Sequence, residues 1–461
     1  MSKRLVLLYA AALCLLLNFL IPPFQNPDEP QHFGAVLIYA LGSSRGPEIE
    51  ERVIEQMDRF DWWRMAGMGR PAELPRRFAD IPFLHFAGSE LMASQLVLYH
   101  AAAGSLLRLV PSEDVLTLYY VCRLFSAVLF CGSLLLLAAA FSQVARGIGQ
   151  TAGLGFFFIL FLPQFSVLSL SVNPESLAIF WGALFFYALA ARMSGRAGRL
   201  TLAVLPVAAL GGFLTDRTGF FLVPLALILP FFFLKRGQPA RSLTLIGGSL
   251  LVTLVAASWA AWLLPVQVYS GLSAVREYFL RGLPQAVRLA APPDFAARYF
   301  LRLLDSFWLK FGWMAFPAPG FFYYVWRTAA LLSFLGILVL AGRRLLGFHQ
   351  AGLPEKPGPA RTGRLVGVCA AAVGLQLAAL WVTSLPTQSF AQGRYLFPVI
   401  FPLALLFVLG LESLGDIFGR LTGRVFVAAF LIFEVIFFVL AVWSQIAPVF
   451  HLTVRAPHPG I

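Results

Sequence analysis

Residues 5–33 read LVLLYAAALCLLLNFLIPPFQNPDEPQHF and contain the two features that decide the fold and the site. The first is an apolar run that extends to Phe24 and follows Lys3-Arg4; a bilayer needs ~20 apolar residues per helix. The run is longer than the apolar part of a signal peptide and lacks a small-residue cleavage site. We therefore expect a retained first membrane helix with a cytoplasmic N-terminus. The second feature is the polar segment at 26–33.

The composition of the whole chain agrees with this beginning. Of 461 residues, 59% are hydrophobic and 12% are charged, and the mean hydropathy is +0.79. Soluble domains are roughly 45–50% apolar and about 25% charged, so an ordinary soluble enzyme and a disordered chain are excluded. We predict an all-α polytopic membrane protein with about eleven transmembrane helices. The spans expected after the first are 116–141, 151–172, 174–191, 200–214, 218–234, 243–264, 321–340, 365–385, 396–411 and 425–444.

The distribution of charge predicts the orientation. The net charge is +13, but most arginines and lysines lie in short loops between apolar runs, where they determine topology rather than bind nucleic acid. These loops fall on one side of the membrane if the segment 91–110 lies flat in the interface instead of spanning. The prediction is a multi-pass membrane protein with its N-terminus inside and its long polar segments outside.

Two long outer segments are then expected, 25–110 and 265–320, within a single integral membrane domain covering 1–461. The first contains apolar residues at helical spacing followed by two tryptophans. This pattern is typical of an amphipathic helix in the membrane interface, with indoles at headgroup depth. The residues concerned are Ile49, Val53, Met57, Phe60, Trp62 and Trp63.

The polar segment NPDEPQHF places two adjacent carboxylates and a histidine between prolines, at the outer end of the first helix. Prolines fix their own backbone and restrict the residue before them. Carboxylates at a membrane edge act as general bases or as ligands of a divalent cation. Asp28 and Glu29 are therefore catalytic candidates, and His32 is a candidate for substrate binding. The competing interpretation is a solvated helix end followed by a turn.

Other outer segments supply further candidates. The turn at 171–176 contains Asn173 and Glu175, although the dipole of the following helix also accounts for a glutamate there. Arg394 lies just before a span on the outer side, against the general charge trend. A lipid-linked phosphate is a natural partner for it, and membrane headgroups are the alternative. Lys310, the only lysine placed outside, is a candidate for binding an anion.

Three more charged residues need a partner. The outer turn TDRT at 215–218 is expected to form a local ion pair between Asp216 and Arg217. Glu434 lies in the middle of the last span, where a carboxylate costs about 2.5–3.5 kcal/mol. We expect Glu434 to pair with a polar group inside the bundle or to be protonated.

Four ordered blocks resemble the signature of the bacterial domain-of-unknown-function 2142 family. NPDEPQHF is similar to its PPDEPxHF, and residues 162–178 are similar to its LPQ…SVNPD-LA segment, with Glu175 for aspartate. SFW…FGW at 306–313 and QGRYLFP at 392–398 resemble its last two blocks, whereas residues 95–100 read QLVLYH where the family has His-Pro-Pro. The family in turn resembles the GT-C membrane glycosyltransferases, which have one acidic motif in the first outer loop and a second after the third span.

This resemblance implies transfer of a sugar from a polyprenyl-phosphate-linked donor to a glycan, lipid or protein acceptor of the cell envelope. Asp28 would be the general base, and Glu29 would orient the acceptor. Arg394 would stabilise the leaving phosphate, and Lys310 or a divalent cation, Mg²⁺ or Mn²⁺, held by Asp28 and Glu175 is the alternative. No redox or nucleotide cofactor and no nucleic acid partner is expected. The resemblance also implies a location in the bacterial cytoplasmic (inner) membrane, with the active face outside. The residues assigned to substrate binding are His32, Asn173, Glu175, Lys310, Arg394 and Tyr395.

Two other functions fit the same sequence: a transporter or flippase of a lipid-linked saccharide, and a non-catalytic subunit of envelope polysaccharide assembly. A transporter often has two repeated halves, which this sequence lacks, and the polar motifs of this sequence cluster outside rather than in the middle of the membrane, whereas Glu434 favours transport. The glycosyltransferase interpretation depends on one spatial expectation. Asp28, Glu175 and Arg394 must converge on a single water-facing pocket.

Overall fold

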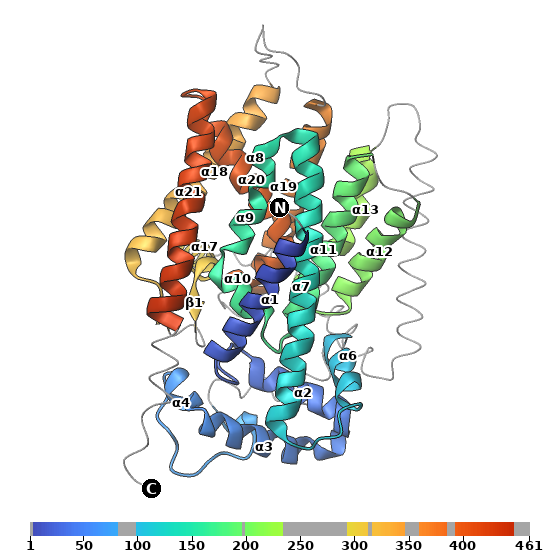
Figure 1. Ribbon diagram of the computed structural model, residues 1–461, viewed down its shortest axis with the longest axis vertical. Coiled ribbons are helices and arrows are strands. Elements are labelled where there is room, and N and C mark those ends of the chain that lie inside the picture. Colours follow the sequence, from blue (N-terminus) through green and yellow to red (C-terminus); the bar gives the residue numbers. More distant parts are fainter. Residues whose placement is uncertain are drawn as a thin grey trace.

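The computed structural model describes residues 3–81, 98–195, 199–233, 293–311, 316–345, 359–384 and 392–446. In these residues the protein is a bundle of long apolar helices with a layer of short helices across one end (Figure 1). The only strands described, β1 (Lys310–Phe311) and β2 (Phe316–Pro317), form a small antiparallel ribbon. The prediction of an all-α membrane protein is confirmed.

Seven helices of the described part are long and apolar enough to cross a bilayer. An eighth span is broken: α8 (Gln150–Gly153) and α9 (Gly155–Leu160) are followed by α10 (Pro163–Ser169) at an angle of 60°. Pro163 begins α10, and its missing N–H ends the preceding helix. The seven are α1 (Lys3–Leu20), α7 (Val115–Ile148), α11 (Pro174–Met193), α18 (Gly320–Leu345), α19 (Pro359–Ser384), α20 (Ile400–Gly415) with the preceding 3-10 turn η5 (Gly393–Val399), and α21 (Arg420–Leu440), which continues into the π-helical turn η6 (Ala441–Ile446).

The predicted count of about eleven spans is not confirmed by the described residues, in which seven helices, or eight with the broken one, are long and apolar enough to cross a bilayer. Two of the predicted spans are the shorter helices α12 (Arg199–Phe213), with 15 residues, and α13 (Leu222–Phe233), with 12. The predicted span 243–264 lies outside the described residues. The described part is therefore a multi-pass membrane protein with seven spans, or eight with the broken one.

The short helices across one end of the bundle are called the cap. Within the described residues α6 covers Leu98–Leu107 and packs closely on α2; residues 91–97 of the segment predicted to lie flat are outside the described residues. A Cβ at Gly104 of α6 would lie 2.6 Å from the Cβ of Tyr39, so only glycine allows this approach. The cap consists of α2 (Glu29–Leu41), η1 (Ser43–Arg45), α3 (Gly46–Arg59), α4 (Trp62–Met65), η2 (Phe78–Asp80) and α6 (Leu98–Leu107).

The cap has its own apolar core, which contains its two tryptophans. The apolar face of α3 is buried, as its periodicity requires. Trp62 and Trp63 are 0% and 3% exposed and belong to the same apolar cluster, together with residues at the start of α7. The two indoles therefore pack inside the protein rather than on its surface, and their depth relative to a membrane stays a prediction.

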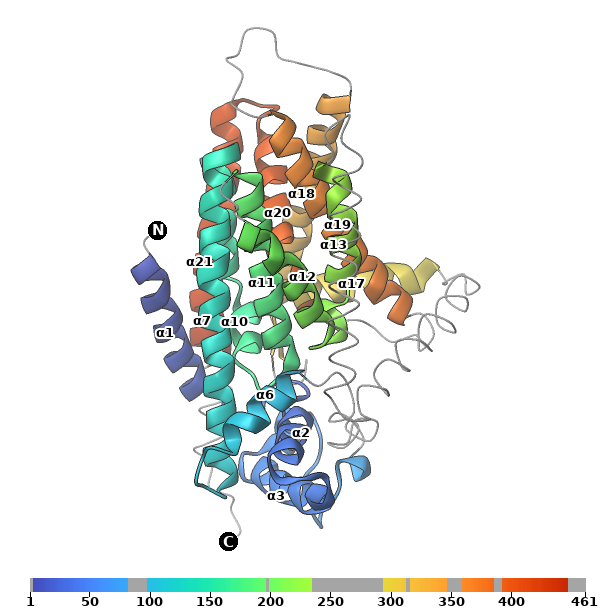
Figure 2. The same cartoon turned by 90° about the vertical axis from the view of Figure 1, so that its right-hand side faces the viewer.

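The cap and the bundle meet where the candidate site lies. Figure 2 shows α1 at one edge of the bundle beside α7, with α2, α3 and α6 lying across the end of the bundle. The turn η5 lies against α11, against α17 (Pro293–Trp308) and against η3 (Arg217–Gly219). Four segments far apart in the chain thus meet near the start of α2.

Candidate functional site

Asp28 has an unusual backbone at the junction of α1 and the cap. It is the N-cap of α2 with φ 63° and ψ 2°, the left-handed conformation, and proline follows in the first turn of the helix. This conformation costs roughly 1–2 kcal/mol for a residue with a Cβ, although aspartate tolerates it better than most. Its side chain is 34% exposed, so the fold holds a strained, accessible carboxylate at this point.

Arg394 connects this carboxylate to a second one. Its side chain is only 2% exposed; Nη2 donates to Oδ2 of Asp28, and Nη1 donates to the carbonyl oxygen of Pro27 at 3.3 Å. Nε lies 3.3 Å from Oε1 of Glu175. One buried guanidinium therefore joins the first loop to the start of α11. The structure brings together the three positions that the sequence analysis expected to converge, and their chemical roles stay predictions.

The charge state of Asp28 follows from this pairing. Burial acts to raise the pKa of Asp28, but the guanidinium of Arg394 outweighs that effect and holds the pKa below its ordinary value of 3.8. Asp28 is therefore ionised at neutral pH and can accept a proton or a hydrogen bond.

Glu175 lies in the first turn of α11, and the capping of that helix fixes its position. The side chain of Asn173 accepts the backbone N–H of Glu175 at 2.9 Å and caps α11, and Pro174 occupies its first turn. The side chain of Glu175 is 7% exposed. Among the described residues neither Oε2 of Glu175 nor Nδ2 of Asn173 has a hydrogen-bond partner. Buried polar atoms are nearly always paired, so these two are available to a ligand.

Tyr395 is in contact with two guanidinium groups. Arg394 and Arg217 are centred 5.2 and 5.4 Å from its ring, and each places Nη2 at 3.4 Å from its hydroxyl oxygen. Arg217 is exposed, whereas Arg394 is buried. The site therefore has a buried and an exposed cation, both in contact with one aromatic ring.

Arg217 is the residue that the sequence analysis missed. The expected ion pair with Asp216 gives way to a different arrangement, in which the Asp216 carboxylate caps η3 by accepting the N–H of Thr218 at 2.8 Å. The carboxylate is used locally, so the arginine is left to reach Tyr395. The only sequence signal was a basic residue in a turn that was expected outside the membrane.

The position of Arg394 depends on contacts between its own segment and residues 306–308. Oγ of Ser306 accepts the N–H of Gly393 at 2.8 Å. A Cβ on Gly393 would lie 2.1 Å from the backbone nitrogen of Phe307, so this approach requires glycine. Gln376 of α19 donates to the carbonyl oxygen of Tyr395 at 2.5 Å. The SFW and QGRY blocks thus hold one another and fix the position of Arg394.

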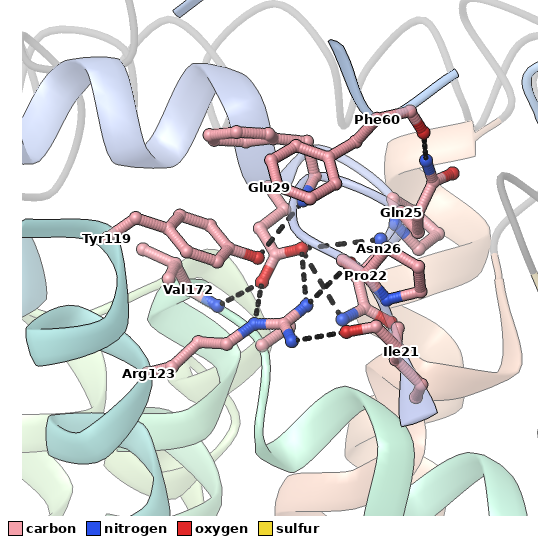
Figure 3. Close-up of polar contacts among 12 residues, drawn as sticks. Ile21, Pro22, Gln25, Asn26, Glu29, Phe60, Tyr119, Arg123 and Val172 are labelled. Atoms are coloured by element: carbon pink, nitrogen blue, oxygen red, sulfur yellow. Dashed lines mark hydrogen bonds and ion pairs between the residues drawn. The ribbon is translucent and has the colours of Figure 1, made fainter. Parts of the chain in front are cut away.

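Two other predicted residues have different surroundings. Lys310, half-buried in β1, has its pKa lowered by burial, and its charged neighbours are Asp305, Arg302 and Arg327 rather than the Asp28 cluster. Glu29 is fully buried and ion-paired with Arg123, so it is not available to a substrate (Figure 3). The assignments of Glu29 as a catalytic residue and of Lys310 as part of the same site are therefore corrected.

His32 faces another histidine. Its Nδ1 lies 3.2 Å from Nε2 of His100 in α6, and the rings stack with their centroids 5.3 Å apart. Burial lowers the pKa of His32 to about 4, so its imidazole is neutral at pH 7. His32 can therefore exchange hydrogen bonds with a substrate but does not supply a positive charge.

The residues present do not fit a divalent cation. Such an ion takes several oxygen ligands, and the two carboxylates proposed for it, Asp28 and Glu175, are both paired with Arg394. Within the described residues, no three histidine, cysteine, aspartate or glutamate side chains come close enough to hold a metal ion. A guanidinium occupies the place between the carboxylates that a cation would need.

Comparison with known proteins identifies a family. A family model described as "Predicted membrane protein (DUF2142)" matches residues 91–403. Three of the four motif blocks, 162–178, 306–313 and 392–398, lie inside the matched region, and the block at 26–33 precedes it. Neither the search of curated proteins nor the search of solved structures gave a match.

Proposed function

The chain belongs to the DUF2142 family of predicted membrane proteins, and from its site we propose that it is a glycosyltransferase of GT-C type. It moves a sugar from a polyprenyl-phosphate-linked donor to a glycan, lipid or protein acceptor of the cell envelope. The observation that carries this proposal is the junction at which the Arg394 guanidinium pairs with the carboxylates of Asp28 and Glu175. An ionised base and a phosphate-binding cation are both needed for such a transfer, and here they are in contact.

The distribution of arginines supports an orientation. α7 and α11 start near the cap and carry Arg146 and Arg192 in their last turns, at the opposite end of the bundle. Basic residues collect on the cytoplasmic side of membrane proteins. The cap and the site then face outward from the bacterial cytoplasmic membrane, where lipid-linked donors present their sugars.

The reaction uses the residues of this junction in two roles. Asp28 accepts the proton of the acceptor hydroxyl, and the acceptor oxygen forms a bond to the anomeric carbon of the sugar. The bond from that carbon to the phosphate oxygen breaks, and its electron pair stays on the polyprenyl phosphate. Arg394 and Arg217 stabilise the resulting negative charge. This direct displacement inverts the anomeric centre.

Donor binding also prepares the base. Without a donor, Asp28 has its pKa held low by Arg394, which makes it a weak base. A phosphate group has the geometry that a guanidinium prefers, so it competes with the carboxylates for Arg394. When the phosphate takes those N–H groups, Asp28 loses its partner and becomes more basic. Proton removal is thereby coupled to the presence of the donor.

The experiment is a donor-cleavage assay with the full chain in proteoliposomes. A panel of polyprenyl-phosphate-linked hexoses and pentoses is supplied with membrane-extracted acceptors, and released polyprenyl phosphate is measured. The account predicts release with at least one donor, together with appearance of the labelled sugar in the acceptor fraction. If no donor in the panel is consumed, the proposed function is contradicted.

One observation favours the second candidate, a flippase of a lipid-linked saccharide. Glu434 in α21 is completely buried and accepts the indole N–H of Trp326 at 2.6 Å, while its Oε2 has no hydrogen-bond partner among the described residues. Carboxyl groups at such depth are often part of transport pathways. Movement of a fluorescent lipid-linked sugar across liposomes that contain the protein, without sugar transfer, would support this alternative.

A further inference from the structure

A second buried ion pair lies directly beside the junction described above. Nε and Nη2 of Arg123 in α7 lie 3.2 Å from Oε1 and Oε2 of Glu29, so the two groups pair through two parallel contacts (Figure 3). Their side chains are 3% and 0% exposed. We call this the Glu29–Arg123 pair. Glu29 directly follows Asp28 in the sequence, yet the pair is closed to solvent and therefore to a substrate.

Arg123 also binds the end of α1. Nη1 donates to the carbonyl oxygen of Ile21 at 2.7 Å, and Nη2 donates to that of Pro22 at 3.2 Å. These carbonyls follow the last turn of α1, where backbone acceptors have no partner within the helix. The segment that carries Asp28 is therefore held on both sides by one guanidinium of α7.

Glu29 also binds the second acidic motif. Its Oε1 accepts the backbone N–H of Val172 at 3.0 Å, in the turn that leads to Glu175. Its Oε2 lies 3.4 Å from the backbone nitrogen of Asn26, in the first motif. A single carboxylate thus contacts the backbone of both segments whose acids meet at Arg394.

We propose that the Glu29–Arg123 pair is a positioning device that sets the separation between Asp28 and Glu175 across Arg394. The inference rests on the proposed function for its catalytic consequence, but its structural part is independent of it. Buried ion pairs contribute little net stability, because desolvation offsets their attraction, whereas their geometry can specify one arrangement of the backbone. Here that arrangement is the separation between the carboxylates of Asp28 and Glu175.

The principal test is Glu29→Asp, which keeps the charge but shortens the reach by about 1.5 Å, one carbon–carbon bond. We expect kcat to fall roughly 10–100-fold, because misplacement by about 1 Å is enough to slow a reaction by that factor. The KM for the donor should stay within about threefold of the wild-type value, since Glu29 does not touch the donor. An unchanged kcat in the folded, purified variant would overturn the proposal.

The matched control is Glu50→Asp. Glu50 is 2% exposed in α3, and it pairs with Arg77 at 3.0 Å and accepts the N–H of Phe78 at 3.0 Å. Its carboxylate is nearly as buried as that of Glu29, although Arg77 is 42% exposed, and the pair joins two parts of the cap and touches neither acidic motif. We expect Glu50→Asp to lower thermal stability while leaving kcat unchanged. A similar loss of kcat in both variants would show a general effect of buried pairs and contradict the proposal.

A readout without catalysis separates this inference from the proposed function. Hydrogen exchange of peptides covering 20–33 and 165–178 should accelerate together in Glu29→Asp, and exchange in α20 should not change. If Glu29→Asp does not fold, Glu29→Gln is used, because its amide oxygen can still accept a hydrogen bond from the backbone N–H of Val172.

A wild-type protein without transferase activity contradicts the proposed function. Unchanged exchange in both peptides contradicts the positioning role.

Discussion

Arg394 donates a hydrogen bond to the carboxylate of Asp28 although the two residues are 366 positions apart in the chain. The pair joins the segment that follows the first span to the segment that precedes α20, so the site exists only in the assembled bundle. Each partner is also held by a local device: Asp28 by its left-handed backbone and Arg394 by the close contact of Gly393 with Phe307. The fold therefore positions both partners of the ion pair before any substrate binds.

Removing the proposed base should abolish transfer without unfolding the protein. Asp28→Asn keeps the size of the side chain, and asparagine tolerates the left-handed backbone. We expect the rate of sugar transfer to fall about 10²–10⁴-fold, the usual contribution of a general base. Asp61→Asn is the matched control, because Asp61 is also left-handed, with φ 56°, but pairs with the exposed Arg64. Transfer at the wild-type rate by Asp28→Asn would remove Asp28 as the base.

Arg394→Gln should destabilise the fold. Losing one partner of a buried ion pair costs about 3–5 kcal/mol, since the remaining charge is left without compensation. Here the uncompensated group is mainly Glu175, whose side chain is 7% exposed. The double variant Arg394→Gln/Glu175→Gln should recover part of the unfolding free energy without recovering donor binding. Additive losses in this double-mutant cycle would show that the two side chains are not coupled.

Arg217→Gln should weaken phosphate binding without destabilising the fold. A charge-assisted hydrogen bond contributes about 1.5–3 kcal/mol, so the Kd for geranylgeranyl phosphate should rise about tenfold or more. The melting temperature should not change, because exposed ionic contacts contribute only about 0–1 kcal/mol. Geranylgeraniol, which lacks the phosphate, controls for binding of the isoprenoid. Arg70→Gln controls for loss of an exposed cap arginine, since Arg70 pairs with Asp58. Equal affinities for wild type and Arg217→Gln would exclude Arg217 from the site.

Acidification should destabilise the protein through its histidine pair. The pKa of His32 falls from 6.5 to about 4 on folding, because burial disfavours the imidazolium. The unfolded chain therefore binds a proton at His32 that the folded chain does not, so stability decreases as the pH falls from 6.5 to 4. The groups that face His32 are Asp28, Glu29, Asp216 and Arg394, with His100 as its hydrogen-bond partner.

The double variant His32→Gln/His100→Gln isolates this effect. Its melting temperature in detergent should fall less between pH 6.5 and 4 than that of the wild type. Asp28 does not interfere, because its pKa in the folded protein lies below 3.8 and its contribution is lost only at lower pH. Superimposable pH curves for the two proteins would show that the histidine pair does not titrate in this way.

The sequence predicted the convergence of Asp28, Glu175 and Arg394 because each lies at the end of an apolar run on the same expected side of the membrane. It did not distinguish Asp28 from Glu29, since adjacent carboxylates look alike until the helix start turns one toward Arg394 and the other toward Arg123. The partner of Glu29 lies inside α7, where an arginine within an apolar run gives no indication of what it contacts.

The fold was predicted in its class, whereas the predicted count of spans is not confirmed by the described residues. Apolar runs mark helices, but they do not show that the span at 150–169 is broken before Pro163. The periodicity of α3 correctly predicted one apolar face. It did not reveal whether that face meets lipid or protein, and burial of Trp62 and Trp63 shows that it meets protein. Amphipathicity identifies a face, whereas its partner depends on tertiary packing.

The central claim is that the junction of Asp28, Glu175 and Arg394 receives the phosphate of a lipid-linked donor. A cryo-EM structure of the full chain in nanodiscs with a bound polyprenyl phosphate tests it most directly. The account predicts phosphate oxygens within roughly 3 Å of the guanidinium groups of Arg394 and Arg217, with Asp28 released from Arg394. A phosphate bound at the other end of the bundle, with both carboxylates still closed on Arg394, would contradict it.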